Sequence, residues 1–398
     1  MNEALKPVCL HNGTVFTGFA AMEHCAVLVE GGLISDVFSQ KRFEQRQFDT
    51  DVRIIDVKGA YIAPGFIDTH IHGIGGYGTE DEDCAASVLE MSRVLVKWGV
   101  TAFNPTLYPS APDHMVRAVE KIASAIGREQ GARIMGLHLE GPFLSPKRLG
   151  VQKPETVQPV NLNLMERFWE ASGGHIVNMT VAPELKGMRE LALFCIKKGI
   201  VLQAGHTNAE YGNMVEGMQV GILHSTHLFN AMRRLDHRNP NAVGAILIHP
   251  EMSCEIIADG FHVHKDLFKL LLRNKPIDKI VLITDGLKPT GQETGPFFAN
   301  QEEVHFHDGA FHRVSDDVIA GSGLTMIRGI RNLAAGGFSM EDAIKTASFN
   351  PAQVMRYNRQ GAIIPGHFAD LTVFDHNFNI RLVMTGGKIV HNTEAGST

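Results

Sequence analysis

About eight short apolar runs recur along the middle of the chain, and stretches with helical periodicity separate them. The runs lie near residues 62–72, 100–107, 133–140, 175–182, 199–206, 221–228, 254–259 and 279–285. Alternating strands and helices are typical of α/β folds, and eight strand–helix units are the number that closes a (β/α)8 barrel. The spacing therefore predicts a TIM-like barrel domain over residues 61–360.

Both ends of the chain carry a different pattern, in which short apolar runs are followed by turn residues. Residues 25–30 precede Gly31-Gly32, and the apolar run at 382–390 is interrupted by Gly386-Gly387. This spacing is typical of β-hairpins. We predict a small β-sandwich domain formed by both chain termini, residues 1–60 plus 361–398.

Composition excludes several classes of partner. The chain has 398 residues, 44% of them hydrophobic, and its net charge of −6 lacks the basic excess that binding to nucleic acid requires. Its five cysteines show no Cys-x-x-Cys spacing, and neither a signal peptide nor an apolar stretch of roughly 18 residues is present. We therefore expect a cytoplasmic protein that binds neither nucleic acid nor a membrane.

Histidine and carboxylate side chains stand at the ends of the first, third, fifth, sixth and eighth runs. They are His70 and His72, then Glu140, His206, His227 and Asp285. In a barrel, catalytic groups come from the carboxyl ends of several strands. Nitrogen and oxygen ligands gathered there suit zinc or iron with a coordination position left for water. The pattern predicts a hydrolytic metal site.

Other readings of these residues stay open at this point. Glu140 could be a buried carboxylate paired with a basic neighbour, and Asp285 could cap a helix because Asp followed by Gly often forms a turn. His138 should face the barrel interior, where it could either support the site or fill the core. His224 lies three residues before His227, so on a regular strand its side chain should point to the opposite face. This favours a structural role for His224.

Several longer motifs recur in the order that one known family shows. They include Pro64-Gly65-Phe66-Ile67-Asp68, His138-Leu139-Glu140-Gly141-Pro142-Phe143, Gly205-His206-Thr207, His227-Leu228-Phe229-Asn230-Ala231-Met232, Asp259-Gly260-Phe261-His262 and Thr284-Asp285-Gly286. Through them the chain resembles the amidohydrolase superfamily, and within it the N-acetylglucosamine-6-phosphate deacetylase family. The resemblance runs nearly from end to end.

The resemblance implies a metal-dependent hydrolase barrel that cleaves the acetamide of N-acetylglucosamine-6-phosphate. Glu140, His206 and His227 would hold the principal ion, while His70 and His72 would complete a second position. The cofactor would thus be one or two divalent ions, zinc or iron. Asp285 would lie at the metal and act as the catalytic acid and base.

Substrate contacts are also implied by the resemblance. Backbone groups at Asn230 and Ala231, together with Arg238 and His262, would bind the sugar phosphate and its hydroxyls. A guanidinium suits phosphate because its planar donors engage two oxygens at once. In the family this arginine commonly reaches into the neighbouring subunit, which implies a homodimer or a higher homo-oligomer.

One departure from the family concerns Gln152, which occupies the place of a histidine that touches the sugar. Glutamine forms hydrogen bonds but carries no charge. Another N-acyl amino sugar, such as N-acetylgalactosamine-6-phosphate, therefore remains a competing substrate. A non-catalytic sugar-phosphate-binding barrel is a further alternative, as is a dihydroorotase-like or N-acyl-amino-acid hydrolase.

Overall fold

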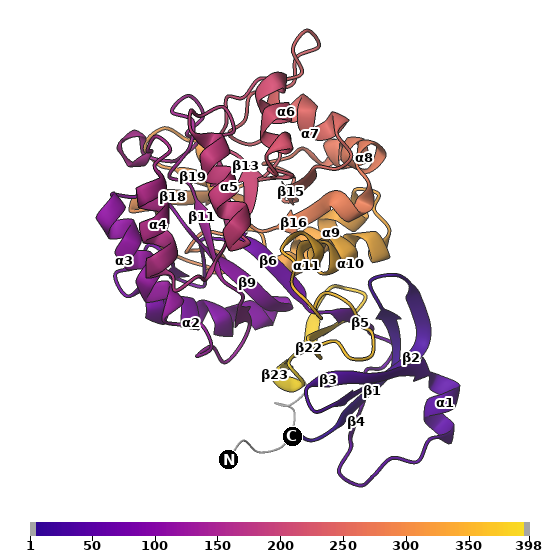
Figure 1. Cartoon of the computed structure of the whole chain (residues 1–398). Helices are drawn as coiled ribbons and strands as arrows, with labels where there is room; N and C mark the ends of the chain where they lie inside the picture. The colour runs from indigo at the N-terminus through magenta and orange to yellow at the C-terminus, as the bar shows by residue number, and fades with distance from the viewer. Residues whose placement is uncertain (1–4, 394–398) are drawn as a thin grey trace.

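The computed structural model describes residues 5–393 and contains the predicted barrel (Figure 1). Its parallel strands are β6 (Phe66–Ile71), β9 (Val100–Leu107), β11 (Leu137–Glu140), β12 (Ile176–Val181), β13 (Val201–Ala204), β14 (His224–Ser225), β15 (Ser253–Ile257) and β16 (Ile280–Ile283). They pair in chain order, and the short β10 (Arg133–Ile134) adds to β9. The Asp285 amide donates to the His70 carbonyl at 3.0 Å, so the last strand meets the first.

Helices cover the outside of the barrel. They are α2 (Cys84–Leu95), α3 (Pro112–Ala123), α4 (Leu162–Ala171), α5 (Met188–Lys198), α6 (Tyr211–Gln219), α7 (Asn241–Ile248), α8 (Lys265–Asn274), α9 (Met326–Ala335), α10 (Met340–Ala347) and α11 (Phe349–Val354), with 3-10 turns η1 (Val96–Trp98), η2 (Pro154–Thr156) and η3 (Ile277–Lys279). In α3, Met115, Val119 and Ile122 are buried at helical spacing, which gives the helix one apolar face. That face packs toward the strands.

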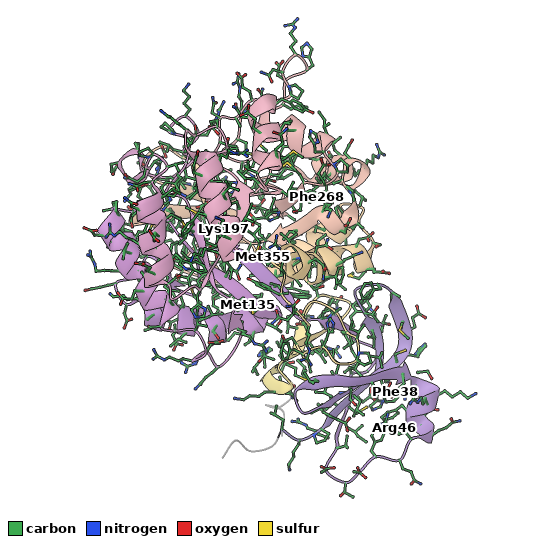
Figure 2. All side chains as sticks on the ribbon, in the orientation of Figure 1. Phe38, Arg46, Met135, Lys197, Phe268 and Met355 are labelled. Atoms are coloured by element: carbon green, nitrogen blue, oxygen red, sulfur yellow. The ribbon has the colours of Figure 1, made fainter. Side chains whose placement is uncertain are left out.

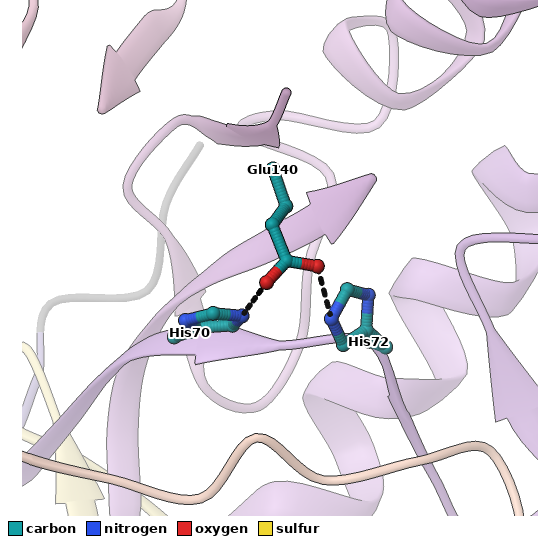
Figure 3. Close-up of side chains that lie close together, drawn as sticks. All are labelled: His70, His72 and Glu140. Carbon is teal, nitrogen blue, oxygen red and sulfur yellow. Dashed lines mark ion pairs between the residues drawn. The ribbon is translucent and has the colours of Figure 1, made fainter. Parts of the chain in front are cut away.

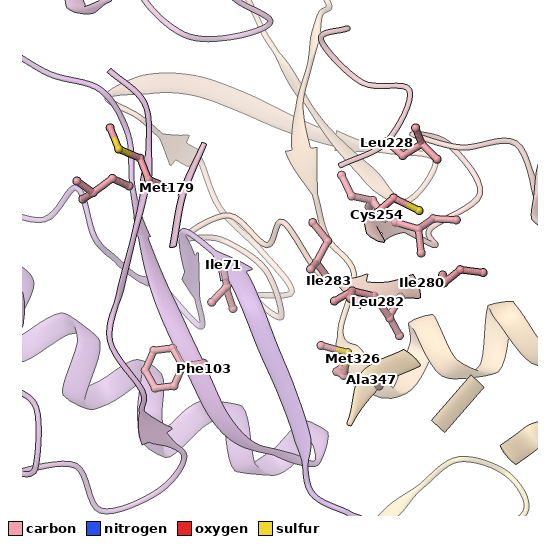
Figure 4. Packing of buried hydrophobic residues seen from close by; sticks show 14 of the residues in the cluster. Ile71, Phe103, Met179, Leu228, Cys254, Ile280, Leu282, Ile283, Met326 and Ala347 are labelled. Carbon is pink, nitrogen blue, oxygen red and sulfur yellow. The ribbon is translucent and has the colours of Figure 1, made fainter. Parts of the chain in front are cut away.

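Apolar side chains fill the layer between strands and helices. Figure 4 shows Phe103 and Met179 on one side of the barrel and Leu282 with Met326 on the other. Burying each such side chain contributes roughly 1.5–3 kcal/mol, so this layer dominates the stability of the domain. It holds the strand ends, and therefore the site, in fixed positions.

Inside the barrel, polar side chains are linked by hydrogen bonds. His138 lies between the Thr106 hydroxyl, 3.1 Å from its Nδ1, and the Thr180 hydroxyl, 2.9 Å from its Nε2. Gln203 donates to Glu255 Oε1 at 3.0 Å. Burial holds the pKa of His138 well below its usual value, and the nearby His70 lowers it further. His138 is thus a neutral member of the interior network, and its ring packs edge-on against His70 at 4.5 Å.

A second, eight-stranded sheet combines both ends of the chain, as predicted. Its strands are β1 (Val8–Phe16), β2 (Ala21–Glu30), β3 (Leu33–Ser39), β4 (Arg53–Asp56), β5 (Tyr61–Pro64), β21 (Leu371–Phe374), β22 (Ile380–Thr385) and β23 (Lys388–Asn392). They form one continuous sheet in which β5 lies between β1 and β21. One face is covered by α1 (Gln40–Gln45) and its neighbours, where the Arg46 guanidinium lies 5.2 Å from the Phe38 ring centre (Figure 2).

The apolar run at 62–72, which we expected to be one barrel strand, is divided between the two sheets. Its first part is β5 of the terminal sheet, and its second part is β6 of the barrel. Gly65 is the junction, and a Cβ there would lie 2.1 Å from Thr101 Oγ1. Only glycine permits this close approach, so the motif residue has a packing role.

A four-stranded antiparallel sheet after β16 was not predicted. It consists of β17 (Phe297–Ala299), β18 (Glu302–His307), β19 (Ala310–Arg313) and β20 (Ile319–Ser322), and a short hairpin, β7 (Gly73–Ile74) with β8 (Tyr77–Gly78), lies after β6. The Ser322 amide donates to the Asp285 carbonyl at 3.1 Å, which fixes β20 to the end of β16. None of the helices within residues 5–393 meets the length and apolarity needed to span a bilayer.

Candidate metal and substrate site

The carboxyl ends of the barrel strands bring the predicted ligands together around Glu140. Its Oε1 lies 3.0 Å from His206 Nε2 and 3.1 Å from His227 Nε2. On the other side, His70 Nε2 lies 3.5 Å from Oε1 and His72 Nε2 lies 3.4 Å from Oε2 (Figure 3). All five side chains are at most 5% exposed. Glu140 is therefore shared by two histidine pairs.

Hydrogen bonds at Nδ1 turn three of these histidines so that Nε2 faces the site. His70 Nδ1 lies 3.0 Å from Glu255 Oε2, and His72 Nδ1 lies 3.1 Å from the Thr106 carbonyl. His206 Nδ1 lies 3.0 Å from the Leu149 carbonyl. A proton on Nδ1 leaves the Nε2 lone pair as a ligand, which is how metal-binding histidines are commonly oriented.

These donors fit a divalent cation. His206 Nε2 and His227 Nε2 lie only 3.1 Å apart, and His70 Nε2 is buried without a hydrogen-bond partner among the described residues. Two groups, His70 with His72 and Glu140, and Glu140 with His206 and His227, place their ligand atoms within 4.8 Å of one another. Buried nitrogen and carboxylate donors without a cationic side chain among them suit zinc or iron.

Asp285 lies beside the histidine pair of β6. Its Oδ1 is 3.5 Å from both His70 Nε2 and His72 Nε2. Burial alone would raise the pKa of Asp285, but the two imidazoles lower it to about 2. Its backbone is left-handed, with φ at 48°, a conformation that is uncommon outside glycine and clusters at functional sites. Asp285 is thus held as a carboxylate at the mouth of the site.

A cavity of about 300 Å³ opens above these residues, and most of the predicted substrate contacts line it. Asn230, Ala231, His262 and Gln152 are in its wall, together with Val318 and the β20 residues Ile319 and Ala320. Burial alone would lower the pKa of His262, but Asp259, whose Oδ2 lies 2.5 Å from Nδ1, raises it. This volume suits a small polar molecule such as a sugar.

Gln152 is placed differently from a residue that only touches substrate. Its Nε2 donates to Glu140 Oε2 at 2.7 Å, while its own Oε1 is buried without a partner among the described residues. One end of the amide therefore holds the central carboxylate. The other end leaves an acceptor at the cavity wall.

Arg238 is the one predicted substrate contact that does not line the cavity of its own chain. It lies on an exposed loop before α7, and this loop projects at the top of Figure 1. Its backbone amide donates to Asp236 Oδ1 at 2.8 Å. The loop points away from the barrel, so the guanidinium would need another chain to reach a cavity.

Two residues beside the site were not singled out from the sequence. Glu255 is fully buried, bonds His70 Nδ1, and accepts from the His227 amide at 3.1 Å. The Tyr108 ring stacks on His72 with centres 3.8 Å apart. Glu255 carried a usable signal, because a carboxylate inside an apolar strand must be paired or bound to a cation. Tyr108 carried none.

Sequence comparison with known proteins matches the chain to one family. The amidohydrolase family model matches residues 61–390. An N-acetylglucosamine-6-phosphate deacetylase of Bacillus subtilis is 34% identical over 335 residues, which cover 82% of this chain and 84% of that protein. The human protein of the same name is 31% identical over 380 residues, covering 92% and 91%.

Solved structures extend the likeness to three dimensions. The N-acetyl-D-glucosamine-6-phosphate deacetylase of Mycobacterium smegmatis matches with a TM-score of 0.88 at 27% identity, covering 97% of this chain and 100% of that one. A mutant of that enzyme in complex with N-acetyl-D-glucosamine-6-phosphate matches with a TM-score of 0.87 at 27% identity, covering 98% and 100%. The chain belongs to the amidohydrolase family, in the branch of the N-acetylglucosamine-6-phosphate deacetylases.

Proposed function

We propose that this protein hydrolyses the acetamide of N-acetylglucosamine-6-phosphate to glucosamine-6-phosphate and acetate. The observation that carries the proposal is the convergence of Glu140, His206 and His227 with Asp285 at the floor of a sugar-sized cavity. A binding module needs no carboxylate for proton transfer. The relatives that align with 82% and 92% of this chain are named for this reaction.

The proposed division of labour follows from the geometry. A zinc or iron ion held by Glu140, His206 and His227 would polarise the acetyl carbonyl and lower the pKa of a water molecule toward neutrality. His70 and His72 would offer a second position next to the shared Glu140. Whether one or both positions are filled is measurable as metal content per chain.

Asp285 would move the proton. As a carboxylate it can accept a proton from the attacking water, and as the resulting acid it can donate that proton to the amine nitrogen as the C–N bond breaks. An amine expelled as its anion is a very poor leaving group, so the second transfer is as necessary as the first.

The proposal is tested by measuring acetate release across a panel of N-acetylated amino sugars, each with and without a 6-phosphate. We expect the highest kcat/KM for N-acetylglucosamine-6-phosphate. N-acetylgalactosamine-6-phosphate as the best substrate would redirect the proposal to the other epimer. Substrate binding without release of acetate would identify a sugar-binding barrel.

Substitution of Arg238 tests phosphate recognition. We propose that this exposed side chain reaches the cavity of a partner subunit in a homodimer or a higher homo-oligomer. In Arg238→Ala, KM for the phosphorylated sugar should rise about 10–100-fold, since a charge-assisted contact is worth about 1.5–3 kcal/mol, whereas the unphosphorylated sugar loses nothing. Equal losses on both sugars would show that Arg238 does not recognise the phosphate. Arg273→Ala on α8 is the matched control.

Substitution of Gln152 tests sugar selection. Gln152→His removes the buried acceptor at the cavity wall and should change the ratio of kcat/KM between glucosamine and galactosamine derivatives by up to about tenfold, the worth of one hydrogen bond. The same assays on Gln45→His, in the distant α1, provide the control. An unchanged ratio would leave Gln152 with its Glu140 contact alone.

We also propose that the enzyme works in the cytoplasm. All five cysteines are free and buried, as expected for a protein of a reducing compartment. Its proposed substrate is a charged sugar phosphate, which does not cross membranes unaided.

A further inference from the structure

A second group of histidines lies on the four-stranded sheet, outside the cavity. His305 and His307 are two positions apart on β18, and His312 is paired directly with His305 on β19. Residues two apart on a strand share a face, and so do directly paired residues. The three imidazoles therefore project from one face, while Val304 and Phe311 are buried on the other.

These rings are somewhat farther apart than ligands on one ion, and as they stand their ligand atoms do not all lie within 4.8 Å of one another. The ring centres of His305 and His312 are 5.6 Å apart, and those of His307 and His312 are 6.2 Å apart. Three imidazoles bound to a tetrahedral zinc ion have centres about 5 Å apart, given Zn–N bonds of about 2 Å. His307 Nε2 lies 3.2 Å from Asp308 Oδ2, so binding would require His307 to leave this carboxylate and His305 to turn. Both side chains are free to move, because His305 is 48% and His307 is 68% exposed.

A carboxylate stands beside the rings. Asp317, in the turn between β19 and β20, has its Oδ1 3.4 Å from His305 Nε2 and 3.5 Å from His312 Nδ1. The same His312 nitrogen lies 3.2 Å from the Asp317 carbonyl oxygen, which leaves His312 Nε2 to bind an ion. No lysine or arginine forms an ion pair with Asp317 among the described residues. Two histidines thus already share one anionic oxygen across two strands and a turn.

We propose a further metal site, separate from the ligands around Glu140, for a borderline divalent ion such as zinc, nickel or copper. Its ligands would be His305, His307, His312 and Asp317. Three imidazoles and one carboxylate are ligands that such ions prefer. The site is solvent-exposed, so its ion would exchange readily, unlike an ion held by the buried ligands around Glu140. It does not depend on the proposed hydrolytic activity.

An ion at this site would restrict the movement of the cavity roof, residues 318–320, which form part of the cavity wall. Asp317 is followed directly by Val318, Ile319 and Ala320, which line the cavity above Asp285. Coordination would join β18 and β19 to this turn and restrict its movement. An ion bound at this exposed site would therefore make the cavity roof more rigid without contacting the substrate.

The binding test uses the enzyme loaded with its resident metal and nickel chloride as the probe. Calorimetric titration should show one further nickel equivalent for the wild type and for His114→Ala, an exposed histidine on α3. The double variant His305→Ala/His312→Ala should lose that equivalent while its resident metal content and melting temperature stay unchanged. His305→Gln/His312→Gln, which keeps polar side chains, should lose it too. A wild type that binds no added nickel, or a double variant that binds it equally well, would overturn the site.

The link to the cavity roof has a separate readout. Nickel should slow amide hydrogen exchange in residues 302–320 of the wild type, because local opening now requires an ion to be released. The same segment in His305→Ala/His312→Ala should exchange at one rate with or without nickel. Nickel binding that leaves exchange unchanged would overturn the link.

Discussion

Asp285→Asn should lower turnover by about two to four orders of magnitude, the usual worth of general acid–base catalysis. The substitution keeps the shape of the side chain but removes the carboxylate that lies 3.5 Å from His70 and His72. Metal content should stay near that of the wild type, because Glu140, His206 and His227 are untouched. Acetate release with N-acetylglucosamine-6-phosphate measures the loss.

Asp49→Asn, at an exposed position between α1 and β4, is the matched control and should keep full activity. Melting temperature separates a chemical defect from a folding defect in both variants. If Asp285→Asn turns over at a near-normal rate, proton transfer belongs to another residue. His262 would then be examined first, because it lines the same cavity and its pKa is raised by Asp259.

Glu140→Gln should have an equally large effect through the metal. Its carboxylate is within 3.1 Å of two imidazole nitrogens, so the amide that replaces it removes the one anionic donor shared by both groups of ligands. We expect substoichiometric zinc or iron and turnover lower by at least about a thousandfold, since several kcal/mol of charge stabilisation are lost. Elemental analysis and acetate release give the two readouts.

A strong chelator should produce the same loss in the wild type, and added zinc or ferrous iron should restore activity there but not in Glu140→Gln. Glu190→Gln on the exposed side of α5 controls for the loss of a carboxylate elsewhere. A metal-free wild type with full activity would contradict the proposal. So would a Glu140→Gln variant with a full metal complement and normal turnover.

The barrel and its ligand set could be predicted because both depend on strand periodicity. Apolar runs identify buried strands, and the carboxyl ends of barrel strands meet at one rim, so His70, Glu140, His206 and Asp285 had to converge once the strands were placed. Glu140 is buried among histidines rather than lysine or arginine side chains, and Gln152 donates to it. Local sequence was sufficient for these features.

Features that depend on loops were missed. The sheet from β17 to β20 carried a hairpin signal, Asp308-Gly309 between alternating apolar residues, but it lies outside the repeating strand–helix units. The contact of Gln152 with Glu140 depends on how the loop after β11 folds back over the rim, which no periodicity encodes. Arg238 raises a different problem: it does not line the cavity of its own chain, so its contact with the substrate stays a prediction.

The position of β5 between β1 and β21 has a consequence for synthesis of the protein. The amino-terminal strands leave the ribosome first, yet β21, β22 and β23 emerge only at the end. Until then the nascent chain exposes an unpaired strand edge and the apolar face around Leu10 and Ile62, which invites aggregation. Phe374, Ile380 and Val383 of β21 and β22 also pack into the barrel core, so carboxyl-terminal truncations should yield chains that precipitate although Glu140, His206, His227 and Asp285 are all present.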